Sequence, residues 1–211
     1  MAWSDSLEKA NDAFGKKLQY YTGSSPVTMG MKFLSFSDEG LTINASVDGL
    51  FRIYSWDTME GGTERFFDNV FQYKSSSKTI SILDTPKEAG DNIIGYHKIY
   101  TFKVNDKTYY LCVYLTIGSS KNAGQGIRVF AIENNKLNDA VKIIKTKTGL
   151  HSELSFDYDF GSVVHSKVRP TIYFDVESKT INLPLVTANG TVTHSYIKYK
   201  FNGTYFERVL N

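Results

Sequence analysis

The side chains best suited to chemistry or recognition gather between residues 55 and 68, a stretch that joins two strand-like runs. It holds a tryptophan, an arginine, a glycine pair and four carboxylates, namely Trp56, Arg65, Gly61-Gly62, Asp57, Glu60, Glu64 and Asp68. Two carboxylates held about 5 to 9 Å apart on either side of a glycosidic bond can hydrolyse it, and an aromatic ring gives the sugar a stacking platform. The stretch therefore allows a carboxylate-dependent hydrolase acting on a glycan or cell-wall polymer.

The same residues also suit a binding loop without catalysis. Glycines allow a positive φ or a close backbone approach, and loops held between rigid strands commonly carry binding residues. A purely structural role is a further alternative, in which Trp56 anchors the loop in the core and Arg65 pairs with one of the acids. Because no catalytic signature matches, we assign no catalytic residue and predict a binding site made of Trp56, Asp57, Glu60, Gly61, Gly62, Glu64 and Arg65.

The other reactive residue types form no recognisable site. Cys112 is the only cysteine, which excludes an internal disulfide, and its apolar neighbours predict a buried, inert thiol. Asp157 and Asp159 share one face of a strand and could ligate calcium, but without an acidic repeat we predict a solvated face. The histidines are far apart in the sequence and lack metal-binding spacing: His97, His151, His165 and His194. We therefore predict no metal ligand and no cofactor.

Two catalytic or phosphate-binding signatures are absent or incomplete. The chain contains no Gly-x-Ser-x-Gly nucleophile elbow. The glycine-rich stretch from Gly118 to Gly126 lacks the Gly-Lys-Ser/Thr ending of a phosphate-binding loop and precedes a β-like run. We predict a mobile hairpin loop there.

Composition and charge narrow the class of protein. The 211 residues include 14 Tyr and 14 Phe, an aromatic surplus typical of sheet. A formal charge of +2, with scattered Lys and Arg, predicts no nucleic-acid partner. No apolar run is long enough to predict a transmembrane segment. If a signal peptide was removed ahead of Met1-Ala2, the protein is periplasmic or extracellular, and otherwise it is cytoplasmic.

One amphipathic helix is predicted over residues 5–22. Asp5 and Glu8 form a capping-box pattern at its start, and Gly23 followed by Pro26 marks its end. Its apolar positions recur every three or four residues: Leu7, Ala10, Phe14, Leu18 and Tyr21. We expect this face to pack against the end or outer face of a sheet.

Alternating apolar and polar residues predict strands over residues 41–210. Asp48-Gly49, Asn189-Gly190 and Asn202-Gly203 predict type I′ hairpin turns, so that consecutive strands pair as an antiparallel meander. The strands fall into three groups, over 41–83, 96–145 and 153–210. We predict a single all-β domain over residues 1–211, either a β-sandwich or partial barrel, or a propeller-like sheet.

Two short motifs carry a family resemblance: Arg52-Ile53-Tyr54-Ser55-Trp56-Asp57-Thr58 followed by Gly61-Gly62-Thr63, and Tyr199-Lys200-Phe201-Asn202-Gly203. They resemble a group of uncharacterised, exported bacterial β-rich proteins. The resemblance implies an envelope or extracellular setting and brings no activity or catalytic residue. We expect a non-catalytic binding domain that contacts a protein, peptide or glycan through the Trp56–Arg65 loop, with the carboxylate-dependent hydrolase as the alternative.

Overall fold

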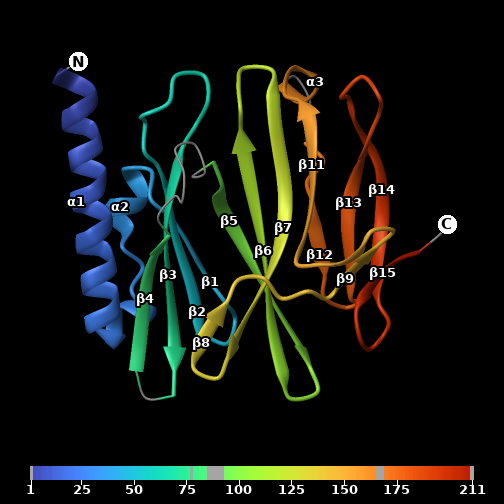
Figure 1. Cartoon of the computed structure of the whole chain (residues 1–211), viewed down its shortest axis with the longest axis horizontal. Helices are drawn as coiled ribbons and strands as arrows, with labels where there is room; N and C mark the ends of the chain where they lie inside the picture. Colours follow the sequence, from blue (N-terminus) through green and yellow to red (C-terminus); the bar gives the residue numbers. More distant parts are fainter. Residues whose placement is uncertain (1, 77, 85–92, 165–168, 210–211) are drawn as a thin grey trace.

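The chain folds into four layers, one long helix and three sheets stacked face to face (Figure 1). The computed structural model describes residues 2–76, 78–84, 93–164 and 169–209. The helix covers the outer face of the first sheet, and the middle sheet lies between the other two. The predicted all-β class, rich in antiparallel pairs and with an N-terminal helix, is confirmed. Over the described residues the stack is a multilayered sandwich in which no sheet closes into a barrel.

The N-terminal helix α1 (Ala2–Ser24) extends beyond the predicted residues 5–22 at both ends. Asp5 therefore lies in the first turn and is not the N-cap, and Gly23 lies inside the helix. The helix ends two residues before Pro26, which opens the 3₁₀ helix η1 (Pro26–Met29). Two short helices, α2 (Leu34–Asp38) and α3 (Gly161–Val164), complete the helical elements of the described residues.

The buried face of α1 differs in part from the predicted one. Leu18 is buried as expected, but Ala10 is exposed and Tyr21 is 61% exposed. Asn11 and Gly15 lie on the packed side instead, because they are the i+4 neighbours that continue the Leu7 to Leu18 stripe. A Cβ on Gly15 would lie 3.1 Å from Leu83 Cδ1, so this glycine lets the helix approach the first sheet closely.

The first sheet is built from four consecutive strands in the order β1-β2-β3-β4, all antiparallel. The strands are β1 (Thr42–Ala45), β2 (Phe51–Asp57), β3 (Phe67–Ser75) and β4 (Lys78–Asp84). The predicted strand group over 41–83 thus becomes one sheet.

The other two predicted strand groups do not match the other two sheets. The strand at residues 153–159 belongs to the middle sheet, and the strand at residues 144–146 belongs to the last one. The middle sheet has the order β11-β7-β6-β5, with β8 paired to β7, and contains β5 (Gly95–Val104), β6 (Lys107–Ile117), β7 (Asn122–Glu133), β8 (Lys136–Asn138) and β11 (Glu153–Asp159). The last sheet has the order β10-β9-β15-β14-β13-β12, with β9 (Ile144–Thr146), β10 (Gly149–His151), β12 (Tyr173–Asp175), β13 (Thr180–Val186), β14 (Val192–Phe201) and β15 (Phe206–Val209). β11 returns to pair with β7, and β9 pairs in parallel with β15.

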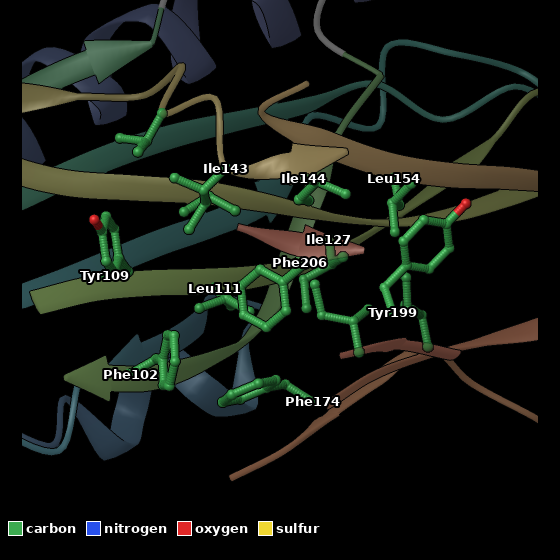
Figure 2. Close-up of a cluster of buried hydrophobic side chains, with 14 of the residues drawn as sticks. Phe102, Tyr109, Leu111, Ile127, Ile143, Ile144, Leu154, Phe174, Tyr199 and Phe206 are labelled. Carbon is green, nitrogen blue, oxygen red and sulfur yellow. The ribbon is translucent and has the colours of Figure 1, made fainter. Parts of the chain in front are cut away.

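The middle sheet is buried on both faces because its strands alternate between two apolar clusters. On β6, Tyr110, Cys112 and Tyr114 face the first sheet, while Leu111 and Val113 face the last one. Figure 2 shows the second of these clusters, in which Leu111 and Ile127 of the middle sheet pack near Phe206 and Phe174 of the last. A third cluster, around Trp56 and Leu18, joins the first sheet to α1.

In each of the three predicted X-Gly turns the glycine has a positive φ, but the turns are not of type I′. Gly49, Gly190 and Gly203 have φ values of +67°, +82° and +108°. Asp48 and Asn189 do not have positive φ, as a type I′ turn would require at both central residues. Asn134-Asn135, between β7 and β8, is the pair in which both φ values are positive, +50° and +63°.

The predicted mobile loop over Gly118–Gly126 is wrong for its second half, since β7 already begins at Asn122. Gly124 and Gly126 are strand residues that other side chains cover. A Cβ on Gly126 would lie 2.2 Å from Tyr114 Cζ, and one on Gly124 would lie 2.5 Å from Thr116 Oγ1. These glycines make room for side chains of β6. In the sequence, glycines that are needed for such packing resemble the glycines of a flexible loop.

Candidate functional site

The loop between β2 and β3 is fastened to both the first and the middle sheet. The amide of Thr58 donates to Phe66 O at 2.9 Å and continues the β2–β3 pairing. The amide of Arg65 donates to Ile117 O at 2.8 Å, which forms an isolated bridge to the end of β6. Backbone bonds therefore hold the two ends of the loop, and its tip projects beside α1.

Asn11 of α1 ties this loop to the helix. Its Nδ2 donates to Thr58 O and to Glu60 Oε1, both at 2.8 Å, and its Oδ1 accepts from Trp56 Nε1 at 3.3 Å. The Trp56 ring packs edge-on against Phe14, with ring centroids 5.0 Å apart. One helical side chain thus satisfies three polar groups of the loop and fixes the indole.

A partly open cavity of about 360 Å³ lies between α1, the α2 segment and the start of the loop. Most of its lining is apolar or aromatic, with a few polar groups at the edge, which is typical of pockets that bind small ligands or side chains. The described lining residues are Leu7, Asn11, Phe14, Phe36, Glu39, Gly40, Leu41, Trp56, Asp57, Thr58 and Met59. The cavity lies where the sequence predicted a binding site, on the helix side of Trp56.

Met59 lies at the edge of this cavity in an unusual backbone conformation. Its φ is +60°, a region that a long side chain rarely adopts, and its side chain is 62% exposed. The Met59 Sδ lies 3.5 Å from Arg65 Nη1. An apolar side chain is therefore held out toward solvent at a conformational cost of about 1 to 3 kcal/mol.

Two carboxylates of the loop, Asp57 and Glu60, are engaged in local contacts. Asp57 Oδ1 accepts from the Met59 amide at 2.8 Å, and its Oδ2 pairs with Arg65 Nη1 at 3.3 Å. Glu60 accepts from Asn11 as described above. Asp68 lies on β3, opposite Trp56 in the strand register. These contacts orient the loop.

The glycine pair has two different roles. A Cβ on Gly61 would lie 2.1 Å from the Glu64 carbonyl oxygen, so the loop can close only with glycine there. A Cβ on Gly62 would meet nothing within 4 Å. Glu64 is exposed on the outer part of the loop, and neither Gly62 nor Glu64 is among the described residues that line the cavity.

A smaller cavity of about 110 Å³ lies on the other side of Trp56, toward the middle sheet. Gly40, Trp56 and Asp57 line both cavities. The smaller one is further lined by Thr42, Ser55, Phe67, Gly95, Tyr96, His97 and Leu115. Trp56 thus forms part of a wall between two adjacent hollows.

Of the predicted site residues, the structure brings Trp56 and Asp57 to the cavity, and Glu60 and Arg65 contact residues that line it. The prediction missed Asn11, Phe36 and Glu39 because they come from the helical segments before the first strand. One signal for Asn11 was present in the sequence, since it is a polar residue in the middle of an apolar helical stripe.

The remaining candidates lie elsewhere in the fold, apart from His97, which lines the smaller cavity. Cys112 is fully buried, and burial raises the pKa of its thiol well above the usual value. Asp157 and Asp159 are exposed on β11, which agrees with the solvated face that the sequence predicts. His97, His151 and His194 lie on three different strands, and His165 falls outside the described residues. Within the described ranges, no three His, Cys, Asp or Glu residues group as a metal site, and no helix has the length and apolar character to cross a bilayer.

No protein-family model, no curated protein and no solved structure matches the chain.

Proposed function

We propose that this protein is a non-catalytic binding domain whose protein or peptide ligand inserts a side chain with an apolar stem into the cavity beside the Trp56–Arg65 loop. The observation that carries the proposal is the cavity itself, which lies at the tryptophan that the sequence singles out. Its volume of about 360 Å³ falls within the range of ligand pockets.

The walls of the cavity favour a side chain over a sugar. Phe14, Phe36 and Leu41 offer apolar contact, whereas a hydroxyl-rich glycan needs many polar partners around it. Burying an aliphatic side chain of a peptide there contributes about 1.5 to 3 kcal/mol. A glycan ligand, the other class that the sequence allows, is therefore less well supported.

Met59 gives a second argument for recognition. Strained backbone conformations persist where the surrounding structure enforces them, and they cluster at ligand-binding sites. Here the strain holds an exposed thioether at the edge of an apolar cavity. Methionine adapts its shape to varied apolar partners, which suits a residue that closes over an inserted side chain.

The contacts of the loop acids favour binding over hydrolysis. Asp57 is paired with Arg65, and Glu60 is bonded to Asn11, so both are used to shape the loop. A hydrolase would need two carboxylates facing each other across a cleft. The envelope or extracellular setting is part of this proposal and rests on the sequence resemblance.

The test is a titration followed by the indole N–H resonance of Trp56 in a proton–nitrogen NMR spectrum. The chain has two tryptophans, so Trp3→Phe leaves Trp56 as the single indole reporter. N-acetyl-norleucinamide, a neutral peptide unit with an unbranched aliphatic side chain, should shift this resonance saturably with a Kd on the order of 10 to 100 mM. N-acetylglucosamine should leave it in place.

Met59→Gly is the matching variant, because it removes the exposed side chain and the strain that the positive φ causes in a residue with a Cβ. The affinity for N-acetyl-norleucinamide should fall about threefold or more while thermal stability stays equal or rises. Leu150→Ala, which removes an exposed apolar side chain from the last sheet, is the control and should change neither quantity. The absence of a saturable shift would overturn the proposal, and saturation by N-acetylglucosamine would replace the peptide ligand by a glycan.

A further inference from the structure

The charged residues that line the cavity are acidic, and Arg65 pairs with one of them, Asp57, from outside the lining. Among the described residues that line it, Asp57 and Glu39 carry carboxylates and none carries a basic group. Glu60, bonded to Asn11 behind the wall, adds a third carboxylate nearby. Carboxylates at the edge of an apolar site attract cations and repel anions.

Glu39 is the carboxylate that is free to meet a ligand. Within the described chain, its side chain is exposed and takes part in no hydrogen bond or ion pair, whereas Asp57 is paired with Arg65. The backbone around it is fixed, because the amides of Glu39 and Leu41 both donate to Phe36 O, at 3.2 and 3.0 Å. The adjacent Gly40, with φ of +89°, turns the chain from α2 into the first sheet. Glu39 therefore projects from an ordered turn at the edge of the cavity.

The walls suit a cation that carries an apolar stem. Phe14, Phe36 and Trp56 contribute aromatic rings, whose faces attract ammonium and guanidinium groups. Lysine combines a four-carbon apolar stem with a terminal ammonium group, so the stem can lie in an apolar pocket while the charge stays at the edge. A purely apolar side chain would give the Glu39 carboxylate no cationic partner, and an acidic side chain would be repelled by it.

We propose that the cavity recognises a lysine side chain of the ligand, with the aliphatic stem against Phe14, Phe36 and Trp56 and the ammonium group beside Glu39. This inference rests on the proposed function, because it specifies which side chain the same cavity takes.

The experiment compares three peptide units that share one backbone, again through the Trp56 indole resonance in the Trp3→Phe protein. N-acetyl-lysinamide carries the ammonium group, N-acetyl-norleucinamide has the same stem without it, and the Nε-acetylated lysinamide keeps the length but removes the charge. At low salt the charged unit should bind about three- to tenfold tighter than either neutral one. This difference should shrink in about 1 M salt, because exposed charges are then screened.

Glu39→Gln should weaken the binding of N-acetyl-lysinamide about two- to fivefold and leave that of N-acetyl-norleucinamide unchanged. Glu177→Gln, an exposed acid in the turn between β12 and β13, is the control and should alter neither affinity. Equal binding of the charged and neutral units, or an unchanged affinity in Glu39→Gln, would overturn the lysine assignment and leave the binding function standing. If none of the three units binds, the proposed function itself fails, and the lysine assignment with it.

Discussion

The indole Nε1–H of Trp56 donates to Asn11 Oδ1 at 3.3 Å, so the wall of the cavity is fastened to a helix that lies 45 residues away in the sequence. The same asparagine donates to Thr58 O and to Glu60 Oε1. Asn11 therefore couples the position of α1 to the shape of the loop. A ligand in the cavity would touch both partners of this contact.

Asn11→Ala should lower the free energy of unfolding by about 1 to 3 kcal/mol, because it leaves loop groups without their partners. It should also shift the Trp56 indole resonance and weaken peptide-unit binding. Urea unfolding and the NMR titration measure the two effects. Asp12→Ala is the control, since it removes an exposed pair with Lys16 that is worth about 0.5 kcal/mol or less. Equal effects of the two variants would contradict the role of Asn11.

Arg52 should be a large contributor to stability, because it holds the segment after α1 onto the first sheet. It is buried, and its Nη1 donates to Thr28 O at 2.7 Å and Met29 O at 2.8 Å, while its Nη2 donates to Met31 O. Arg52→Met would leave these carbonyls without their donors and should cost about 2 to 4 kcal/mol.

Arg65→Met is the matched control for Arg52→Met, measured by the same urea unfolding. Arg65 is partly exposed and its pair with Asp57 spans 3.3 Å, so its loss should cost only about 0.5 to 1 kcal/mol. A cost for Arg65→Met as large as that for Arg52→Met would contradict the claim that burial and the three carbonyl contacts make Arg52 the larger contributor.

Gly126 should not tolerate even one added carbon, because Tyr114 lies directly over it. Gly126→Ala should destabilise the protein by about 1 to 3 kcal/mol through overpacking. In the background of Tyr114→Ala the same substitution should cost less, with a coupling of about 1 kcal/mol or more in a double-mutant cycle. Gly62→Ala, whose Cβ would meet nothing within 4 Å, should be nearly neutral. An additive double mutant would rule out the contact as the cause.

Cys112 should stay unreactive toward a thiol reagent until the protein unfolds, because it is fully buried. Burial raises the pKa of its thiol, so the unfolded thiol ionises first as the pH increases. Stability linked to Cys112 is thus complete below the unfolded pKa and declines as the pH rises above it. Denaturation of the wild type and Cys112→Ala across pH 7 to 9.5 measures this slope. A reaction in native buffer, or equal slopes, would refute it.

Local sequence patterns predicted the N-terminal helix and most of the strands but missed the short helices and several of the strand pairings. Alternation and turns predicted the strands and the first sheet, since those pairings join neighbours in the chain. The pairing of β11 with β7 skips over β8 to β10, and the parallel pairing of β9 with β15 joins distant segments. Turn chemistry reports only on consecutive strands, so neither contact could be read from it.

Only one wall of the cavity at the candidate site was predictable from the sequence. Trp56 and Asp57 stood out by residue type and lie at the cavity, but the opposite wall comes from α1 and α2. No local rule connects Asn11 or Glu39 to a loop beyond the first hairpin. At Gly124 and Gly126 the sequence predicted a loop where the structure has a strand. Glycines that accommodate a neighbouring strand's side chains resemble glycines that make a loop.

The place of β15 between β9 and β14 also bears on how the chain folds as it leaves the ribosome. The first sheet can form as soon as its four consecutive strands have been made, whereas the hairpin of β9 and β10 reaches the last sheet only through β15, which is synthesised after every other strand described. Until then the apolar side chains around Ile144 lack Phe206 of β15 as a partner. The nascent chain would therefore expose this half of its core late in synthesis, when a chaperone would be of most use to it.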